Sequence, residues 1–147
     1  MMPFRKPLLA AGVMVLAGIG FLGTGDAYAM NTTDNQPKKA VKIVQTAGRQ
    51  KLGTFAPDFA RYNDDILFGE VWSKNDVLPL KERSIVTVSA LIAQGITDSS
   101  LKYHMETAKK NGVTKDEMAE IITQLAFYSG WPKAWAAFGY AKEVYND

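Results

Sequence analysis

The sequence predicts an all-helical protein whose helices form one domain. Three observations support this prediction, and all of them lie in the stretch 80–130, where helix boundaries are clearest. Thr114 followed by Glu117 is a capping box, which starts a helix, and Gly112 after two lysines is a typical helix end. The third observation is the apolar run from Leu80 to Gln94, which shows no strand-like alternation and is long enough for a buried helix.

Six segments carry helical signals. Val41, Val44 and Ala47 have helical spacing, which predicts a short helix ending near Gly53. Pro57 suits a first helical turn, and Gly69 is a candidate break in the helix that follows. The expected helices are 40–51, 57–73, 80–94, 98–111, 114–129 and 132–145. In the second of them, the apolar residues expected on roughly one side are Phe59, Tyr62, Ile66, Phe68 and Trp72.

Residues 1–29 have the three parts of a secretory signal. Arg5 and Lys6 precede an apolar run, and Ala27-Tyr28-Ala29 matches a small-x-small cleavage site. We therefore expect a mature chain that begins near Met30 and is periplasmic or secreted, with an uncleaved membrane anchor as the alternative. The predicted organisation is a signal peptide at 1–29, a polar leader and short helix at 30–53, and one domain at 54–147.

Composition excludes several classes of function. The chain has no cysteine, which rules out disulfides, thiolate metal sites and thiol redox chemistry. With one histidine and no cysteine, we expect no metal site. The formal net charge is +2, and the charges are dispersed, so we expect no nucleic-acid partner and, once the signal is cleaved, no membrane partner. The many large aromatic residues in so small a domain favour a homo-oligomer.

The sequence resembles the carboxymuconolactone decarboxylase family, to which the alkylhydroperoxidase-D-like proteins are related. Four ordered blocks between residues 56 and 145 carry the resemblance: DDILFGEVW, KERSIVTVSALIAQG, LKYHMETAKKNGVTKDEMAEII and AFYSGWPKAW. It implies about six helices built around a helical hairpin, in subunits that form rings, as trimers or hexamers. It also implies decarboxylation of a small carboxylated lactone without a cofactor, because the unsaturated lactone itself accepts the electrons that carbon dioxide leaves behind.

The sequence departs from the family in two respects. The peroxidase branch has Cys-x-x-Cys followed by His, and at that spacing from His104 this chain has Thr97 and Ser100. Peroxidase activity is therefore not expected. The decarboxylase branch acts in cytosolic catabolism, whereas this chain carries an export signal.

His104 is the first candidate catalytic residue. It shares the apolar stripe of its helix with Leu101, Met105 and Ala108, so it is either a hydrogen-bonded core histidine or a proton donor and acceptor. The resemblance supports the second role, since the family places a histidine in this motif, and both roles stay open.

Arg83 and Glu82 are the other candidate catalytic residues. Arg83 suits bidentate binding of a carboxylate, or it pairs with a neighbouring acid. Glu82 is expected to orient His104, to act as a base, or simply to be solvated at a helix start. We predict that Arg83 and His104 face one pocket.

Aromatic side chains are the candidate walls of a substrate pocket. These are Phe68, Trp72, Tyr128 and Trp131, the last on the strength of the resemblance. Core or subunit-interface packing is the alternative for all four. Two functions stay open: a cofactor-free decarboxylase or lactone-processing enzyme, and a non-catalytic exported oligomer that binds a small aromatic or organic acid.

Overall fold

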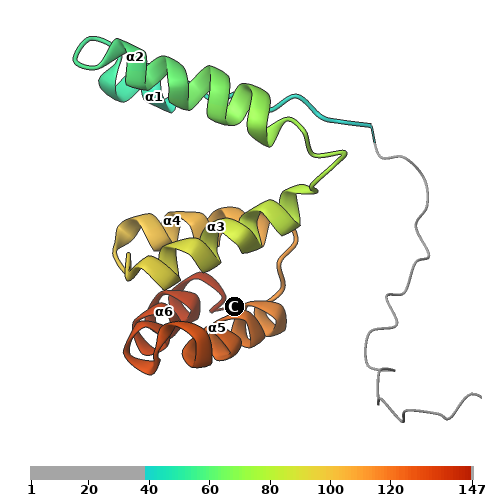
Figure 1. Ribbon diagram of the computed structural model, residues 1–147, viewed down its shortest axis with the longest axis vertical. Coiled ribbons are helices and arrows are strands. Elements are labelled where there is room, and N and C mark those ends of the chain that lie inside the picture. Colours follow the sequence, from blue (N-terminus) through green and yellow to red (C-terminus); the bar gives the residue numbers. More distant parts are fainter. Residues whose placement is uncertain (1–38, 147) are drawn as a thin grey trace, which may run out of the picture. The chain divides into compact units, whose positions relative to one another are not determined.

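The computed structural model describes residues 39–146, which contain six α-helices, one π-helix and no strand (Figure 1). The all-helical prediction is confirmed. The predicted secretory signal and its cleavage site lie outside the described residues. Within the described part, no helix is both long and apolar enough to cross a membrane.

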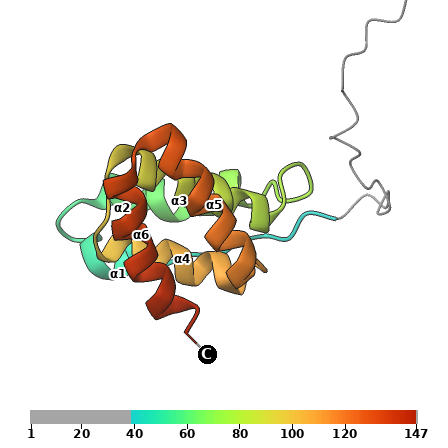
Figure 2. The ribbon, with the colours of Figure 1, turned by 90° about the horizontal axis from the view of Figure 1, so that it is seen from below.

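Four helices pack around the main core. They are α3 (Leu80–Gln94), α4 (Ser99–Lys110), α5 (Lys115–Ser129) and α6 (Trp131–Val144). Figure 1 shows α3 beside α4 and α5 beside α6, and Figure 2 shows α6 against α4. The short connections within α3–α4 and α5–α6 make each pair an antiparallel helical hairpin.

Local signals explain where these helices begin and end. The Asp98 carboxylate caps α4 by accepting a hydrogen bond from the Ser100 amide at 2.8 Å. Both halves of the predicted Thr114–Glu117 capping box are present at the start of α5. Gly95 and Gly112 have positive φ angles of 78° and 93°, which glycine adopts at low cost, and they follow the ends of α3 and α4.

The core of these four helices is apolar. Its buried members are Val88, Ile92, Leu101, Met105, Ala108, Val113, Met118, Ile122, Ala126, Ala134, Ala137, Ala141 and Tyr145. A fully buried Leu, Ile or Met side chain stabilises the folded state by about 1.5–3 kcal/mol relative to an exposed one. The hydroxyl of Ser84, which is also buried, is satisfied by the Leu80 carbonyl and by the Asn111 amide.

The first three helices form a second group of mutually packed elements. They are α1 (Ala47–Leu52), α2 (Pro57–Arg61) and the π-helix η1 (Tyr62–Trp72), and each of them contacts the other two. The predicted helix over 40–51 is too long, because residues 39–46 are not helical. Long-range hydrogen bonds hold that segment extended: the Val41 amide donates to Asn75 Oδ1, and the Ile43 amide donates to Ser73 Oγ, both at 2.8 Å.

The predicted break at Gly69 is wrong. The chain changes winding between Arg61 and Tyr62 instead, and Gly69 is buried inside a continuous π-helix. In a π-helix the backbone bonds join residues five apart, so side chains five apart come into line. The expected apolar stripe therefore does not form. Trp72 is buried, whereas Phe59, Tyr62 and Ile66 are exposed.

Candidate functional site

A buried carboxylate holds α1 against η1. The side chain of Asp64 is fully buried and accepts hydrogen bonds from the amides of Gly48 and Arg49, both at 2.9 Å, and from the side-chain amide of Asn63. A Cβ at position 48 would lie 2.7 Å from Asp64 Oδ1, so the close approach requires glycine. We call Asp64 and these three partners the Asp64 hub.

The electrostatics of the Asp64 hub favour the charged carboxylate. Burial alone would raise the pKa of Asp64, but the hydrogen bonds from Arg49, Asn63 and Gly48 and the nearby guanidinium together lower it below its ordinary value. The Arg49 guanidinium also pairs with exposed Asp65 at 2.6 Å. The hub therefore holds α1 against the part of η1 that contains Asn63.

A pocket of about 530 Å³ contains His104. From α4 and its start, it is lined by Ser99, Ser100, Tyr103 and His104. The remaining lining comes from the first group of helices and the segment before α1: Gln45, Ala47, Gly48, Lys51, Leu52, Phe59, Asn63, Leu67 and Phe68. Its volume falls in the range of small-molecule sites, which is about 300–1,000 Å³.

His104 is a half-buried, neutral group in this pocket. Leu101, Met105 and Ala108 are fully buried as the stripe predicted, and His104 lies at the stripe's edge rather than inside the core. Burial lowers the pKa of the imidazole below its usual value of about 6.5. The Tyr103 ring meets it edge-on, with ring centroids 5.2 Å apart.

The ring nitrogens of His104 make no hydrogen bond with any of residues 39–146, and they are not among the buried unpaired atoms of that part of the chain, so they are accessible. A core histidine would ordinarily be satisfied by a protein group. The observed environment therefore fits a ring that is open to a ligand. Lys51 is the one cation among the described residues that line the pocket, and it is exposed.

The structure brings together only some of the predicted site residues. Phe68 lines the His104 pocket. Its ring is next to that of buried Trp72, and the two ring centroids are 5.8 Å apart. Ser100, at the position of one peroxidase cysteine, also lines the pocket, while Thr97 does not.

Arg83 is placed elsewhere in the described part of the chain. Its Nη2 donates to the Lys74 carbonyl at 2.9 Å, and its Nε is buried without a hydrogen-bond partner among the described residues. Glu82 is exposed at the start of α3. Tyr128 and Trp131 are exposed by 82% and 56%, near the turn between α5 and α6. None of these four lines the His104 pocket.

Sequence reasoning missed the polar residues contributed by the first helices. Gln45, Lys51 and Asn63 reach the pocket because the Asp64 hub folds α1 onto η1, and this long-range contact has no periodic signature. One signal was available: Asp64 and Gly69, a carboxylate and a glycine that are both buried, lie on either side of the apolar run 66–68. Such positions indicate a special packing requirement.

Fold and pocket together define a class, namely an all-helical domain with a small-molecule pocket beside one titratable ring. The model of the carboxymuconolactone decarboxylase family matches residues 57–143, and the chain belongs to this family. It is 40% identical over 98 residues to a 4-carboxymuconolactone decarboxylase of Acinetobacter baylyi, which covers 67% of this chain and 72% of the relative.

A second relative has no assigned activity. It is an uncharacterized 15.0 kDa protein from the nqo9-nqo10 intergenic region of Paracoccus denitrificans, 30% identical over 84 residues, or 56% of this chain and 62% of that protein. The chain is thus decarboxylase-like at the level of the family.

Proposed function

We propose that the protein is a cofactor-free carboxy-lyase or lactone-processing enzyme that acts on a small carboxylated substrate in the His104 pocket. The observation that carries the proposal is a half-buried imidazole, without a hydrogen-bond partner among the described residues, on the wall of a pocket of small-molecule size. Family membership and the printed activity of the Acinetobacter relative support the same class of reaction.

The proposed reaction needs no external oxidant or reductant. The bond between a ring carbon and the substrate carboxylate breaks, carbon dioxide leaves, and the bonding electron pair moves into the unsaturated lactone as a dienolate. A proton then adds to carbon. His104 is proposed to relay that proton: the neutral imidazole takes it up from water and passes it to carbon, and the lowered pKa lets the imidazolium release it readily.

Carboxylate binding in the His104 pocket is assigned to Lys51, which lines it and can attract a carboxylate as a point charge. Arg83, the bidentate anchor that the sequence predicts, does not line this pocket and donates to the Lys74 carbonyl. The Arg83→Met variant therefore tests the role that the sequence predicts for it. Among donors on the pocket wall, the Asn63 amide and the Tyr103 hydroxyl suit a developing dienolate oxygen.

The test is turnover of carboxylated butenolides by the purified protein and by separate His104→Gln, Arg83→Met and Lys51→Met variants. Loss of His104 should lower kcat about 10²-fold, the usual scale for a lost general acid, with little change in melting temperature. Lys110→Met, at an exposed position at the end of α4, is the matched control and should change neither value.

The pH dependence has a definite sign. A lowered pKa keeps His104 neutral down to a pH below its ordinary pKa of about 6.5, and the ring is protonated only at lower pH. If the imidazolium gives the proton to carbon, activity limited by its ionisation should rise as pH falls through that lowered pKa. A fully active His104→Gln variant would exclude the proposed role.

A second function, non-catalytic binding of a small aromatic or organic acid, is favoured by one observation. Arg83 does not line the pocket, which leaves Lys51 as the one cation on its described wall. Saturable binding of benzoate that depends on Lys51, without turnover of any carboxylated butenolide, would select this function.

We also propose that the protein is exported and forms a homo-oligomer, trimer or hexamer. Large apolar side chains near the α5–α6 turn support the oligomer: Phe127, Tyr128, Trp131 and Trp135 are each more than half exposed. Light scattering measures the oligomer, and the amino terminus of exported protein reports on signal cleavage. A monomer at micromolar concentration would contradict the proposed homo-oligomer.

A further inference from the structure

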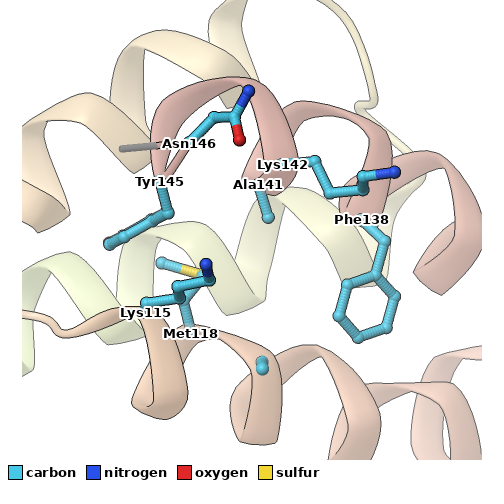
Figure 3. Close-up of a pocket in the computed structure, with 8 residues that line it drawn as sticks. Lys115, Met118, Phe138, Ala141, Lys142, Tyr145 and Asn146 are labelled. Carbon is cyan, nitrogen blue, oxygen red and sulfur yellow. The ribbon is translucent and has the colours of Figure 1, made fainter.

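A second pocket lies between α5 and α6, and none of its residues belongs to the His104 pocket. Its volume is about 300 Å³. Figure 3 shows Lys115 and Met118 on α5 opposite Ala141 on α6, with Tyr145 beyond the end of that helix. Phe138 and Lys142 line the other end of the pocket, and the Lys142 side chain extends away from Lys115. We call this pocket the α5–α6 groove.

The wall of the groove is largely apolar. Met118 and Ala141 are buried, and Phe138 is partly buried against the core. The Tyr145 hydroxyl is already used, because it donates a hydrogen bond to the Val113 carbonyl at 3.1 Å. The groove can therefore receive an apolar body, and methionine and phenylalanine side chains can adapt to its shape.

The two cations at the groove are not neutralised by described residues. Lys115 and Lys142 are exposed, come from different helices, and make no hydrogen bond or ion pair with a described residue. The acids nearest to them in sequence that form ion pairs bind other lysines. Glu117 pairs with Lys81 at 2.6 Å, and Glu143 pairs with Lys102 at 2.7 Å.

We propose that the α5–α6 groove binds a small anion with an apolar body, of the class of aromatic or medium-chain carboxylates. The apolar wall would take the body, and Lys115 and Lys142, one from each helix, would attract the carboxylate. A second copy of the chain fits less well, because a pocket this small between two unpaired cations suits a compact anion better than a helix face. The site goes beyond the proposed function, since it uses neither His104 nor its pocket.

The experiment follows the methyl resonance of Met118 by NMR in the full chain labelled at methionine methyl groups. Benzoate, octanoate and their uncharged amides are the four probes. At least one carboxylate should shift the Met118 resonance saturably, and its amide should bind at least about tenfold more weakly. The comparison of benzoate with octanoate decides between an aromatic and a medium-chain body.

Three variants locate the bound anion. Lys115→Gln and Lys142→Gln should each weaken binding by roughly fivefold, the upper range for an exposed ion pair. Ala119→Leu should block binding while both lysines remain, because Ala119 lines the groove. Lys110→Gln, outside the groove, and His104→Gln should bind as the unmodified protein does.

Several results would overturn the proposal. These are the absence of a Met118 shift at millimolar carboxylate, equal binding of acid and amide, and unchanged affinity in both groove lysine variants. A Met118 resonance that responds to protein concentration instead of the probes would show that another copy occupies the groove. The two proposals can fail separately. A His104→Gln variant that loses butenolide turnover but still binds the carboxylate at the groove would show that the two sites are independent.

Discussion

The two groups of helices are ordered by different forces. Among described residues, the α3–α6 group buries a continuous apolar cluster that includes Ile92, Met105 and Ile122. The α1–α2–η1 group buries little: Gly48, Ala60, Asp64, Gly69 and Trp72. In this group α1 is joined to η1 by the hydrogen bonds of the Asp64 hub. The bundle therefore depends on area removed from water, whereas the contact of α1 with η1 depends on a few directional bonds to one charge.

This difference matters for the candidate site because the His104 pocket takes its walls from both groups. The imidazole stands on a helix of the apolar bundle, while Lys51, Asn63 and Phe68 belong to the hydrogen-bonded group. Conditions that loosen the first group should disturb the pocket before they unfold the bundle.

The largest expected effect is a cavity in the bundle. Met105→Ala removes a fully buried side chain and should lower the free energy of unfolding by about 2–5 kcal/mol. Val86→Ala on the exposed face of α3 is the control and should cost less than about 0.5 kcal/mol. Urea unfolding followed by circular dichroism measures both. Equal costs would show that the described bundle does not form the core in solution.

A smaller and more local effect is expected at the Asp64 hub. Asp64→Asn replaces one acceptor oxygen by a donor, which must face an amide of Gly48 or Arg49. Hydrogen-exchange protection of these amides should fall by roughly 10- to 100-fold, while protection in α3–α6 stays unchanged.

Asp65→Asn is the matched control, because Asp65 pairs with the same arginine at the surface. The pKa of Asp64 is lowered, so its stabilising contribution is present above the unfolded value of about 3.9 and is lost as pH falls through the lower folded value. Equal loss of protection in both groups would contradict the division between them.

The smallest expected effect concerns Tyr145, which closes the bundle at its carboxyl end. Tyr145→Phe leaves the Val113 carbonyl without this donor and should cost about 1 kcal/mol at neutral pH. Burial, with a contribution from the charge of Glu117, raises the pKa of Tyr145 to about 12. The unmodified protein should therefore lose stability as pH rises from about 10 to about 12.

Urea unfolding at pH 7, 10 and 11 measures this effect. The Tyr145→Phe variant should not show this loss of stability at alkaline pH. Tyr128→Phe, which changes an exposed phenol, should behave as the unmodified protein does. An alkaline loss that persists in the Tyr145→Phe variant would assign it to another group.

The helices of the bundle could be predicted because residues next to each helix end determine where it begins and ends. The Thr114–Glu117 box, the glycines at 95 and 112, and Pro132 each act within a few residues, and the observed ends lie within one residue or two of the predicted ones. The fold class followed from these helices without any long-range information.

The first group could not be predicted in the same way. Residues 41–46 have helical spacing, yet their backbone is bound by Ser73 and Asn75, about 30 positions away. Because η1 winds as a π-helix, a helical wheel drawn at 3.6 residues per turn predicts the wrong set of buried side chains for it. The candidate site shares this limit: His104 and Phe68 could be placed at a pocket, but Lys51 and Asn63 could not.

The π winding of η1 also determines how this helix can vary in length. Because side chains five apart fall into line, Asn63 and Phe68 line the same pocket, and Asp64 and Gly69 share the buried side. Removing one residue between 65 and 67 would make the members of each pair four apart, which is the spacing that brings side chains together on an α-helix. A one-residue deletion here therefore keeps these pairs on one side, whereas in α4 or α5 it would turn every later side chain by about 100°.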